Sequence, residues 1–221
     1  MRTGRFIGLV WLLYFITAII GQFLLQGIVV PGNATATAAN LLAQETVFRV
    51  GIAVGLIANA FYVALAVLLY EMFRRVDRTA ALLAAFFSLS GCVIQSFGSV
   101  FPLTALSVVD PNQPLGALHM GQSPALALML FNAQMHAINI GLVFFGFNCL
   151  LLGYLILKSK FVPPILGMLL VLAGAGWLTF LFAPLPTLLA VVVQVLGFIA
   201  ELAVLVWLLV RGGRIEIGSR A

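Results

Sequence analysis

Charged residues are scarce in this chain of 221 residues. Only 8% of its residues are Asp, Glu, Lys or Arg, whereas soluble domains carry about 25%. Hydrophobic residues make up 63% of the chain, and its mean hydropathy is +1.20. So few charges cannot cover the surface of a soluble globule. The composition therefore predicts an integral membrane protein.

Residues that carry metal or catalytic chemistry are also few. The chain has two cysteines and two histidines. Cys92 and Cys149 both lie within apolar runs and no C-x-x-C occurs, which argues against a structural disulfide or zinc site. The sequence contains no G-x-S-x-G, H-E-x-x-H or P-loop. We expect no metal and no cofactor, and whether the protein is an enzyme stays open.

Six apolar runs are long enough to cross a bilayer, which takes about 20 residues. We predict an all-α integral membrane protein, a single domain over residues 1–221 with a six-transmembrane-helix bundle. We also expect short interfacial helices on the outer face, one after the first span and one at about 124–134. For 124–157, one tilted helix is the alternative. The expected spans are about 6–30, 48–70, 80–109, 136–157, 161–182 and 188–210.

Basic residues lie on alternate sides of these spans, and Arg49 is the exception among eleven Lys and Arg. Because basic loops stay cytoplasmic, both termini are expected in the cytoplasm (N-in/C-in). This bias and attraction to anionic lipid explain the net charge of +5 better than nucleic-acid binding does. Expected partners are therefore membrane lipid and a possible small-molecule ligand, with no nucleic acid and the oligomeric state open. The ten other basic residues are Arg2, Arg5, Arg74, Arg75, Arg78, Lys158, Lys160, Arg211, Arg214 and Arg220.

Polar residues recur at a similar depth in four spans. Such groups are costly in hydrocarbon and tend to face the bundle interior or a wet cavity. Their recurrence at one depth has two interpretations: hydrogen bonds that hold helices together, or a path for a ligand or ion. Gln194 shares a helix face with Glu201. The layer comprises Asn59, Gln95, Asn148 and Glu201.

Glu201 is the most informative single residue. A carboxylate at the centre of a membrane helix costs a few kcal/mol, and no Lys or Arg lies at that depth. We expect a neutral acid hydrogen-bonded to Asn59 or Gln95, unless a cation or water reaches it. The alternatives are a protonatable site for transport or substrate binding, and a catalytic acid.

Outer-side residues give weaker signals. His136 and Asn139 share a polar stripe with Asn132, and His136 fits a hydrogen-bonded interface residue better than a metal ligand paired with His119. Arg49 either pairs with Glu45 four residues before it or recognises an anionic headgroup or substrate.

Glycines mark one expected helix contact. Gly167 with Gly174, and the run Gly174, Ala175 and Gly176, give the fifth span small-residue faces, which are typical of close helix packing in membranes.

Several stretches resemble a bacterial membrane family known as domain of unknown function 4386. They cover nearly the whole chain in order: residues 30–40 (VPGNATATAAN) running into 48–51 (FRVG), 76–79 (VDRT), 141–154 and 201–203 (ELA). The resemblance implies a bacterial inner-membrane protein with several spans, and the family brings no established activity.

The leading hypothesis is a multi-pass inner-membrane protein that binds or translocates a small molecule or lipid through a polar cavity centred on Glu201. The alternatives are an intramembrane enzyme acting on a lipid-like substrate, with Glu201 or His136 as acid or base, and a structural or signalling partner without a ligand. Candidate ligand-binding residues are Glu201, Gln194, Gln95, Asn59, Asn148, His136, Asn139 and Arg49.

Overall fold

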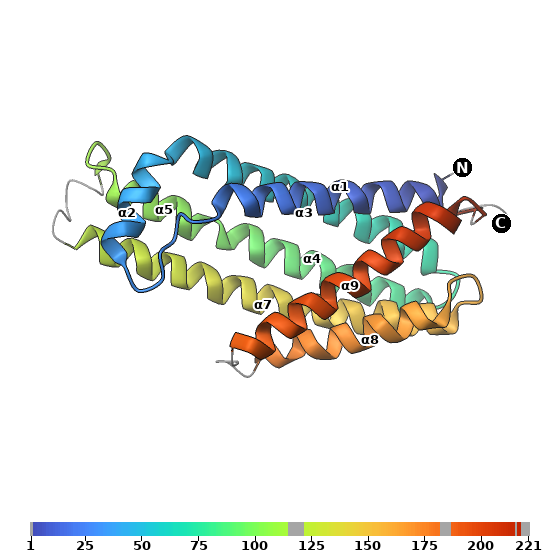
Figure 1. Ribbon diagram of the computed structural model, residues 1–221. Helices are drawn as coiled ribbons and strands as arrows, with labels where there is room; N and C mark the ends of the chain where they lie inside the picture. Colours follow the sequence, from blue (N-terminus) through green and yellow to red (C-terminus); the bar gives the residue numbers. More distant parts are fainter. Residues whose placement is uncertain (1, 115–121, 182–186, 215, 218–221) are drawn as a thin grey trace. The chain divides into compact units, whose positions relative to one another are not determined.

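A computed structural model describes residues 2–114, 122–181, 187–214 and 216–217. This part of the chain is almost wholly helical (Figure 1). Six of its helical segments are long and apolar enough to cross a membrane, which confirms the predicted all-α membrane fold. Residue 119 and residues 183–186, between the fifth and sixth expected spans, lie outside the described residues.

The helices follow one another along the chain with short connections. A two-residue antiparallel pairing joins β1 to β2, with Arg2 opposite Ile217. The elements are β1 (Arg2–Thr3), α1 (Gly4–Leu25), α2 (Ala34–Ala43), α3 (Glu45–Phe73), α4 (Arg78–Gly98), α5 (Val100–Val109), α7 (Ser123–Lys158), α8 (Pro164–Leu178), α9 (Thr187–Arg211) and β2 (Glu216–Ile217). Single 3-10 turns follow α8 (Thr179–Leu181) and α9 (Gly212–Arg214).

The first helix ends earlier than its apolar run. We expected it to reach about residue 30, but α1 ends at Leu25. Gly27 has a φ of +80° and Gly32 a φ of +74°, values that L side chains rarely adopt. The N–H of Asn33 donates to the carbonyl of Val30 at 3.0 Å, which gives a turn with Pro31 second and Gly32 third, as in type II turns.

The expected break before the fourth span is absent. We predicted a separate outer helix at 124–134, but α7 is one helix of 36 residues from Ser123 to Lys158, the alternative that we had named. Pro124 lies in its first turn, where a missing N–H costs nothing. A helix of this length spans about 54 Å, well beyond the roughly 30 Å of a bilayer core.

The third span contains the interruption instead. Its expected range of 80–109 divides at Ser99 into α4 and α5. Pro102 lies in the first turn of α5 and has no N–H to donate to the carbonyl of Gly98, so the series of helical hydrogen bonds is interrupted here.

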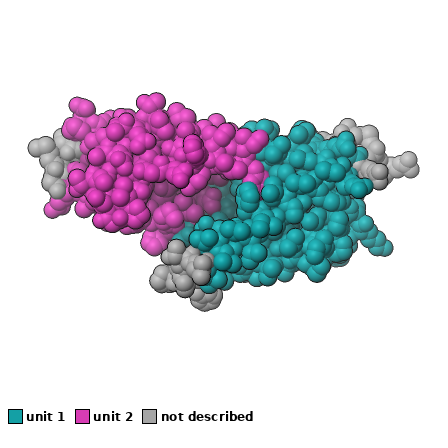
Figure 2. Space-filling model, in the orientation of Figure 1, with its two compact units in different colours: residues 1–14, 60–93, 139–221 teal, residues 15–59, 94–138 magenta. Residues whose placement is uncertain are grey.

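Contacts divide the chain into two compact units (Figure 2). Unit 1 comprises Met1–Tyr14, Ala60–Val93 and Asn139–Ala221, and unit 2 comprises Phe15–Asn59 and Ile94–Ile138. Helices α1, α3, α4 and α7 contribute residues to both units. The single domain over residues 1–221 stays a prediction.

Unit 2 is built around α2 and its neighbours. Asn33 is the N-cap of α2, and its side chain accepts from the N–H of Ala36 at 2.9 Å. The fully buried hydroxyl of Thr37 accepts from the N–H of Val30 at 3.0 Å and lies 2.9 Å from the carbonyl of Asn33. These bonds fold the 26–33 segment against α2. The core contains Ile28, Leu41, Phe48, Ile52, Ala105, Leu106, Ala127 and Phe131.

Unit 1 contains the predicted glycine contact. A Cβ added to Gly153 of α7 would lie 2.7 Å from the carbonyl oxygen of Gly167 of α8, and one added to Gly174 would lie 2.8 Å from that of Gly146. The backbones of α7 and α8 therefore touch at two levels. On the other side of α8, the ring of Trp177 covers Gly197 of α9. The expectation of close packing at Gly167 and Gly174 is confirmed.

Candidate functional site

An acid and several aromatic side chains meet inside unit 1. Helix α1 supplies Trp11 and Tyr14, α3 supplies Tyr62, α7 supplies Asn148 and Cys149, and α9 supplies Glu201. We call these six residues the Glu201 cluster. Trp11, Asn148 and Cys149 are each 2% exposed or less, so the cluster lies in the interior of the unit.

Aromatic contacts fix the position of Tyr62. Its ring meets that of Tyr14 edge-to-face, with centroids 4.7 Å apart, and that of Phe145 in the same manner at 4.9 Å. The side-chain amide of Asn148 donates to the hydroxyl of Tyr62 at 3.4 Å. Edge-to-face pairs add about 0.5–1.5 kcal/mol beyond area burial. Tyr62 is therefore held by three partners.

Glu201 is the acidic member of the cluster and is half-buried. Its carboxyl group interacts electrostatically with the phenols of Tyr14 and Tyr62 and with the thiol of Cys149. The indole N–H of Trp11 lies near this carboxyl group and has no hydrogen-bond partner among the described residues.

The expected polar layer falls into two parts. Asn148 and Glu201 belong to unit 1 and are both members of the cluster, whereas Asn59 and Gln95 belong to unit 2. The amide of Asn59 donates to the hydroxyl of Ser96 at 3.0 Å, so a helix-to-helix hydrogen bond occupies it. A single layer through all four residues stays a prediction.

The remaining candidates lie at less buried positions. Gln194 and His136 are exposed, and Asn139 is half-buried. Arg49 forms the expected ion pair with Glu45, with 2.8 Å between Nε and Oε1, and both side chains are well exposed. Among the described residues no three His, Cys, Asp or Glu side chains are grouped as metal ligands would be.

Cavities in unit 1 are small. Two of the best-formed ones each have about 10 Å³, roughly the space for one water molecule. The first has an apolar lining that includes Trp11 and Trp207, and the second is lined in part by Ser88 and Asn148. Glu201 lines neither cavity.

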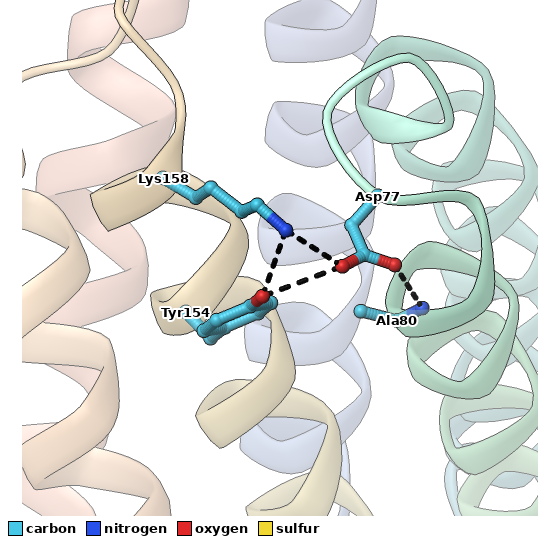
Figure 3. Close-up of polar contacts among 4 residues, drawn as sticks. All are labelled: Asp77, Ala80, Tyr154 and Lys158. Atoms are coloured by element: carbon cyan, nitrogen blue, oxygen red, sulfur yellow. Dashed lines mark hydrogen bonds and ion pairs between the residues drawn. The ribbon is translucent and has the colours of Figure 1, made fainter.

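A polar contact outside the spans joins the α3–α4 turn to the end of α7 (Figure 3). Asp77 accepts from the N–H of Ala80 at 3.1 Å, which caps α4, and from Lys158 Nζ at 2.9 Å. The hydroxyl of Tyr154 lies 3.3 Å from the same carboxylate oxygen as Lys158, and Lys158 donates to this hydroxyl at 3.0 Å. The hydrogen bonds from Lys158 and Ala80 lower the pKa of Asp77 below its usual range.

A family model matches almost the whole chain. The match covers residues 6–212, and the model describes a domain of unknown function, DUF4386. The chain belongs to this family. No curated protein and no solved structure matches the sequence. Together with the six apolar helices, the match identifies this DUF4386 chain as a multi-pass membrane protein.

Four members of the cluster in this DUF4386 protein were not candidates from the sequence: Cys149, which was considered only for a disulfide or zinc site, and three aromatic residues. Trp11, Tyr14 and Tyr62 read as ordinary apolar residues, because a search for acids, amides and histidines passes over aromatic side chains. One signal was present: Trp11 and Tyr14 are three residues apart, so their polar ends share a helix face. That signal does not reveal which acid the face meets.

Proposed function

We propose that this DUF4386 protein binds or moves a small molecule or lipid within the membrane, at the Glu201 cluster. The observation that carries the proposal is an acid in a membrane helix with no basic residue near it. Apart from Arg49, the sequence has no Lys or Arg between Arg5 and Arg74, between Arg78 and Lys158, or between Lys160 and Arg211. An internal ion pair for Glu201 at that depth is therefore ruled out by composition.

Energetics supports a role for the acid beyond packing. A carboxyl group in hydrocarbon costs a few kcal/mol, and an apolar side chain of similar size on α9 would avoid that cost. Tyr14, Tyr62 and Cys149 offer polar atoms but no positive charge. Residues that lower stability without a structural return are typical of functional sites.

A structural or signalling role without a ligand is the second candidate, and one observation favours it. The best-formed cavities hold no more than about one water molecule, and the amides of Asn59 and Asn148 already have partners. The enzyme alternative has less support. His136 is exposed and belongs to unit 2, and no contact between it and an acid is found among the described residues.

We propose the bacterial inner membrane as the location, with both termini in the cytoplasm. The charge bias supports this orientation, and so does the β1–β2 pairing, which holds residues near the two ends of the chain together. Reporter fusions test it. A fluorescent protein that folds only in the cytoplasm should be active when fused after Arg211 and inactive after Asn112. The reverse pattern would show that the termini lie on the outer side of the membrane.

A screen of binding partners tests the proposed function. Diverse small molecules and lipids are added to purified wild type, Glu201→Gln and Glu71→Gln in one detergent, and thermal unfolding is followed. Glu71→Gln is the matched control, because Glu71 pairs with Arg74 at 3.1 Å outside the cluster. We expect compounds that raise the unfolding temperature of wild type and control but not of Glu201→Gln. If every stabilising compound acts equally on all three proteins, the proposal is wrong.

A further inference from the structure

The Glu201 cluster has the chemistry of a cation site. We propose that its ligand is a hydrophobic organic ammonium cation, which displaces the proton of Glu201 when it binds. This inference rests on the proposed function and names the class of molecule that the site takes. Three features of unit 1 carry it: the charges near Glu201, the aromatic rings that interact with it, and the donor on Trp11.

Charge is the first feature. The titratable groups near Glu201 are Tyr14 on α1, Tyr62 on α3 and Cys149 on α7, with Cys92 on α4 close to both tyrosines. Helix α8, which packs on α9, has no titratable residue. Every one of these groups is neutral or negative in each of its protonation states. An anionic ligand would find no positive charge there, whereas a cation supplies the one charge that is missing.

Aromatic rings are the second feature. A cation placed over the face of Trp, Tyr or Phe is attracted by the ring quadrupole, most strongly when it is desolvated, and quaternary ammonium groups are recognised in this way. Trp11, Tyr14 and Tyr62 bring three such rings from two helices to one carboxyl group. An acid among aromatic rings is suited to an alkylated ammonium group, which does not need the six or more oxygen ligands that a hard inorganic cation requires.

The third feature is the indole N–H of Trp11. This side chain is 2% exposed, and its N–H has no hydrogen-bond partner among the described residues although it lies near Glu201. A buried donor without an acceptor is unfavourable. An ionised Glu201 would supply a strong acceptor after a small movement. The N–H of Trp11 therefore favours the ionised form of Glu201, which is the form that a bound cation needs. Glu201 then holds either a proton or the cation.

The surroundings of Glu201 on α9 explain why the cation must be hydrophobic. Glu201 is half-buried, and its neighbours Phe198 and Leu202 are exposed by 44% and 37%. In a membrane such side chains face hydrocarbon rather than water. Since the cavities are too small for more than water, we infer that the ligand comes from the bilayer through the exposed part of Glu201. Inorganic cations do not dissolve there.

Calorimetry with a matched pair of probes tests the inference. Benzyltrimethylammonium is compared with neopentylbenzene, its neutral counterpart in which carbon replaces the charged nitrogen. Titrations into purified protein are run at about pH 6 and about pH 8, each in two buffers with different ionisation enthalpies. If one carboxyl group exchanges a proton for the cation, binding releases up to about one proton, and the affinity rises with pH by up to about tenfold per unit.

Variants assign the effect to the cluster. Glu201→Gln should weaken binding of the cation at least about tenfold and abolish proton release, while Glu71→Gln should bind like wild type. Trp11→Phe keeps a ring but lacks the N–H, and should bind more weakly with a smaller proton release. If Glu201→Gln does not give a monodisperse helical protein, Glu201→Asp and Trp11→Phe replace it. Their affinity for the cation and their proton release are then compared with those of wild type.

The outcomes separate this inference from the proposed function. Equal binding of both probes, or cation binding without proton release, overturns the inference. If the cation does not bind but neutral compounds act through Glu201 in the thermal screen, the proposed function stands and the cation inference is wrong. If no compound distinguishes Glu201→Gln from wild type, both are wrong.

Discussion

The backbone contact between α7 and α8 in unit 1 gives a sharp prediction about stability. We expect Gly153→Ala and Gly167→Ala each to destabilise the protein, because these residues bring the backbones of α7 and α8 together. The new methyl group at residue 153 would lie 2.6 Å from Cγ2 of Val171 and 2.7 Å from the carbonyl oxygen of Gly167. At residue 167 it would lie 2.8 Å from the carbonyl oxygen of Gly153.

The size of the effect follows from these distances. Ordinary contacts of a Cβ begin at 3.4 Å, so the helices must separate by roughly 0.5–1 Å, a gap that forfeits about a quarter to a half of the dispersion attraction of the atoms involved. Packing is a main source of helix association in lipid, where no hydrophobic force acts between helices. Overpacking costs about 1–3 kcal/mol, and we expect this range for each variant.

Thermal unfolding in one detergent measures the change. A loss of 1 kcal/mol lowers the unfolding temperature by about 2–4 °C in a chain of this size. Gly55→Ala on α3 is the control, because a Cβ there would meet no atom within 4 Å. It should leave stability unchanged or raise it by up to about 1 kcal/mol, since Gly is unfavourable inside helices.

A double variant tests whether the two glycines act at one contact. Once the first methyl group has separated α7 from α8, the second meets less resistance. The combined loss in Gly153→Ala with Gly167→Ala should therefore fall short of the sum by about 0.5–3 kcal/mol. Unfolding temperatures that match wild type, or losses as large in Gly55→Ala, would refute this account of the packing.

Three further predictions concern single hydrogen bonds. Because Lys158 and the N–H of Ala80 lower the pKa of Asp77 below 3.8, the folded state favours the carboxylate. The ionised Asp77 therefore stabilises the fold above about pH 4, and this stabilisation is lost as the pH falls through the lowered pKa. A plot of stability against pH should show this loss for wild type and not for Asp77→Asn. Tyr62→Phe leaves the buried amide of Asn148 without its partner, and unfolding should show a loss at the lower end of about 1–3 kcal/mol, since the bond is long at 3.4 Å. Asn33→Ala removes the N-cap of α2 and should cost about 0.5–2 kcal/mol in the same assay.

Local chemistry in the sequence was sufficient to predict most of the fold. Apolar runs bounded by basic residues predicted the six membrane helices. Helix ends were harder to predict, because a turn made of apolar residues has the same hydropathy as the helix before it. The chain leaves α1 at Leu25 because Gly27 and Gly32 adopt positive φ, although the residues around them are as apolar as those of the helix.

The candidate site was only partly predictable. The cost of an acid in hydrocarbon singled out Glu201 from the sequence alone. Its neighbours depend on how α1, α3, α7 and α9 rotate about their axes, which is decided by long-range packing. For this reason Asn59 and Gln95 were expected beside Glu201, whereas the structure gives Asn59 the hydroxyl of Ser96 as its partner.

The most direct test of the central claim is the unfolding temperature of Glu201→Gln against wild type, in one detergent at neutral pH and without ligand. Gln keeps the size and the hydrogen-bonding atoms of the acid but cannot ionise. If Glu201 is a binding residue rather than a structural one, the variant should unfold at the same temperature or higher. A variant that unfolds several degrees lower would show that the acid holds the fold together, and would contradict the proposed site.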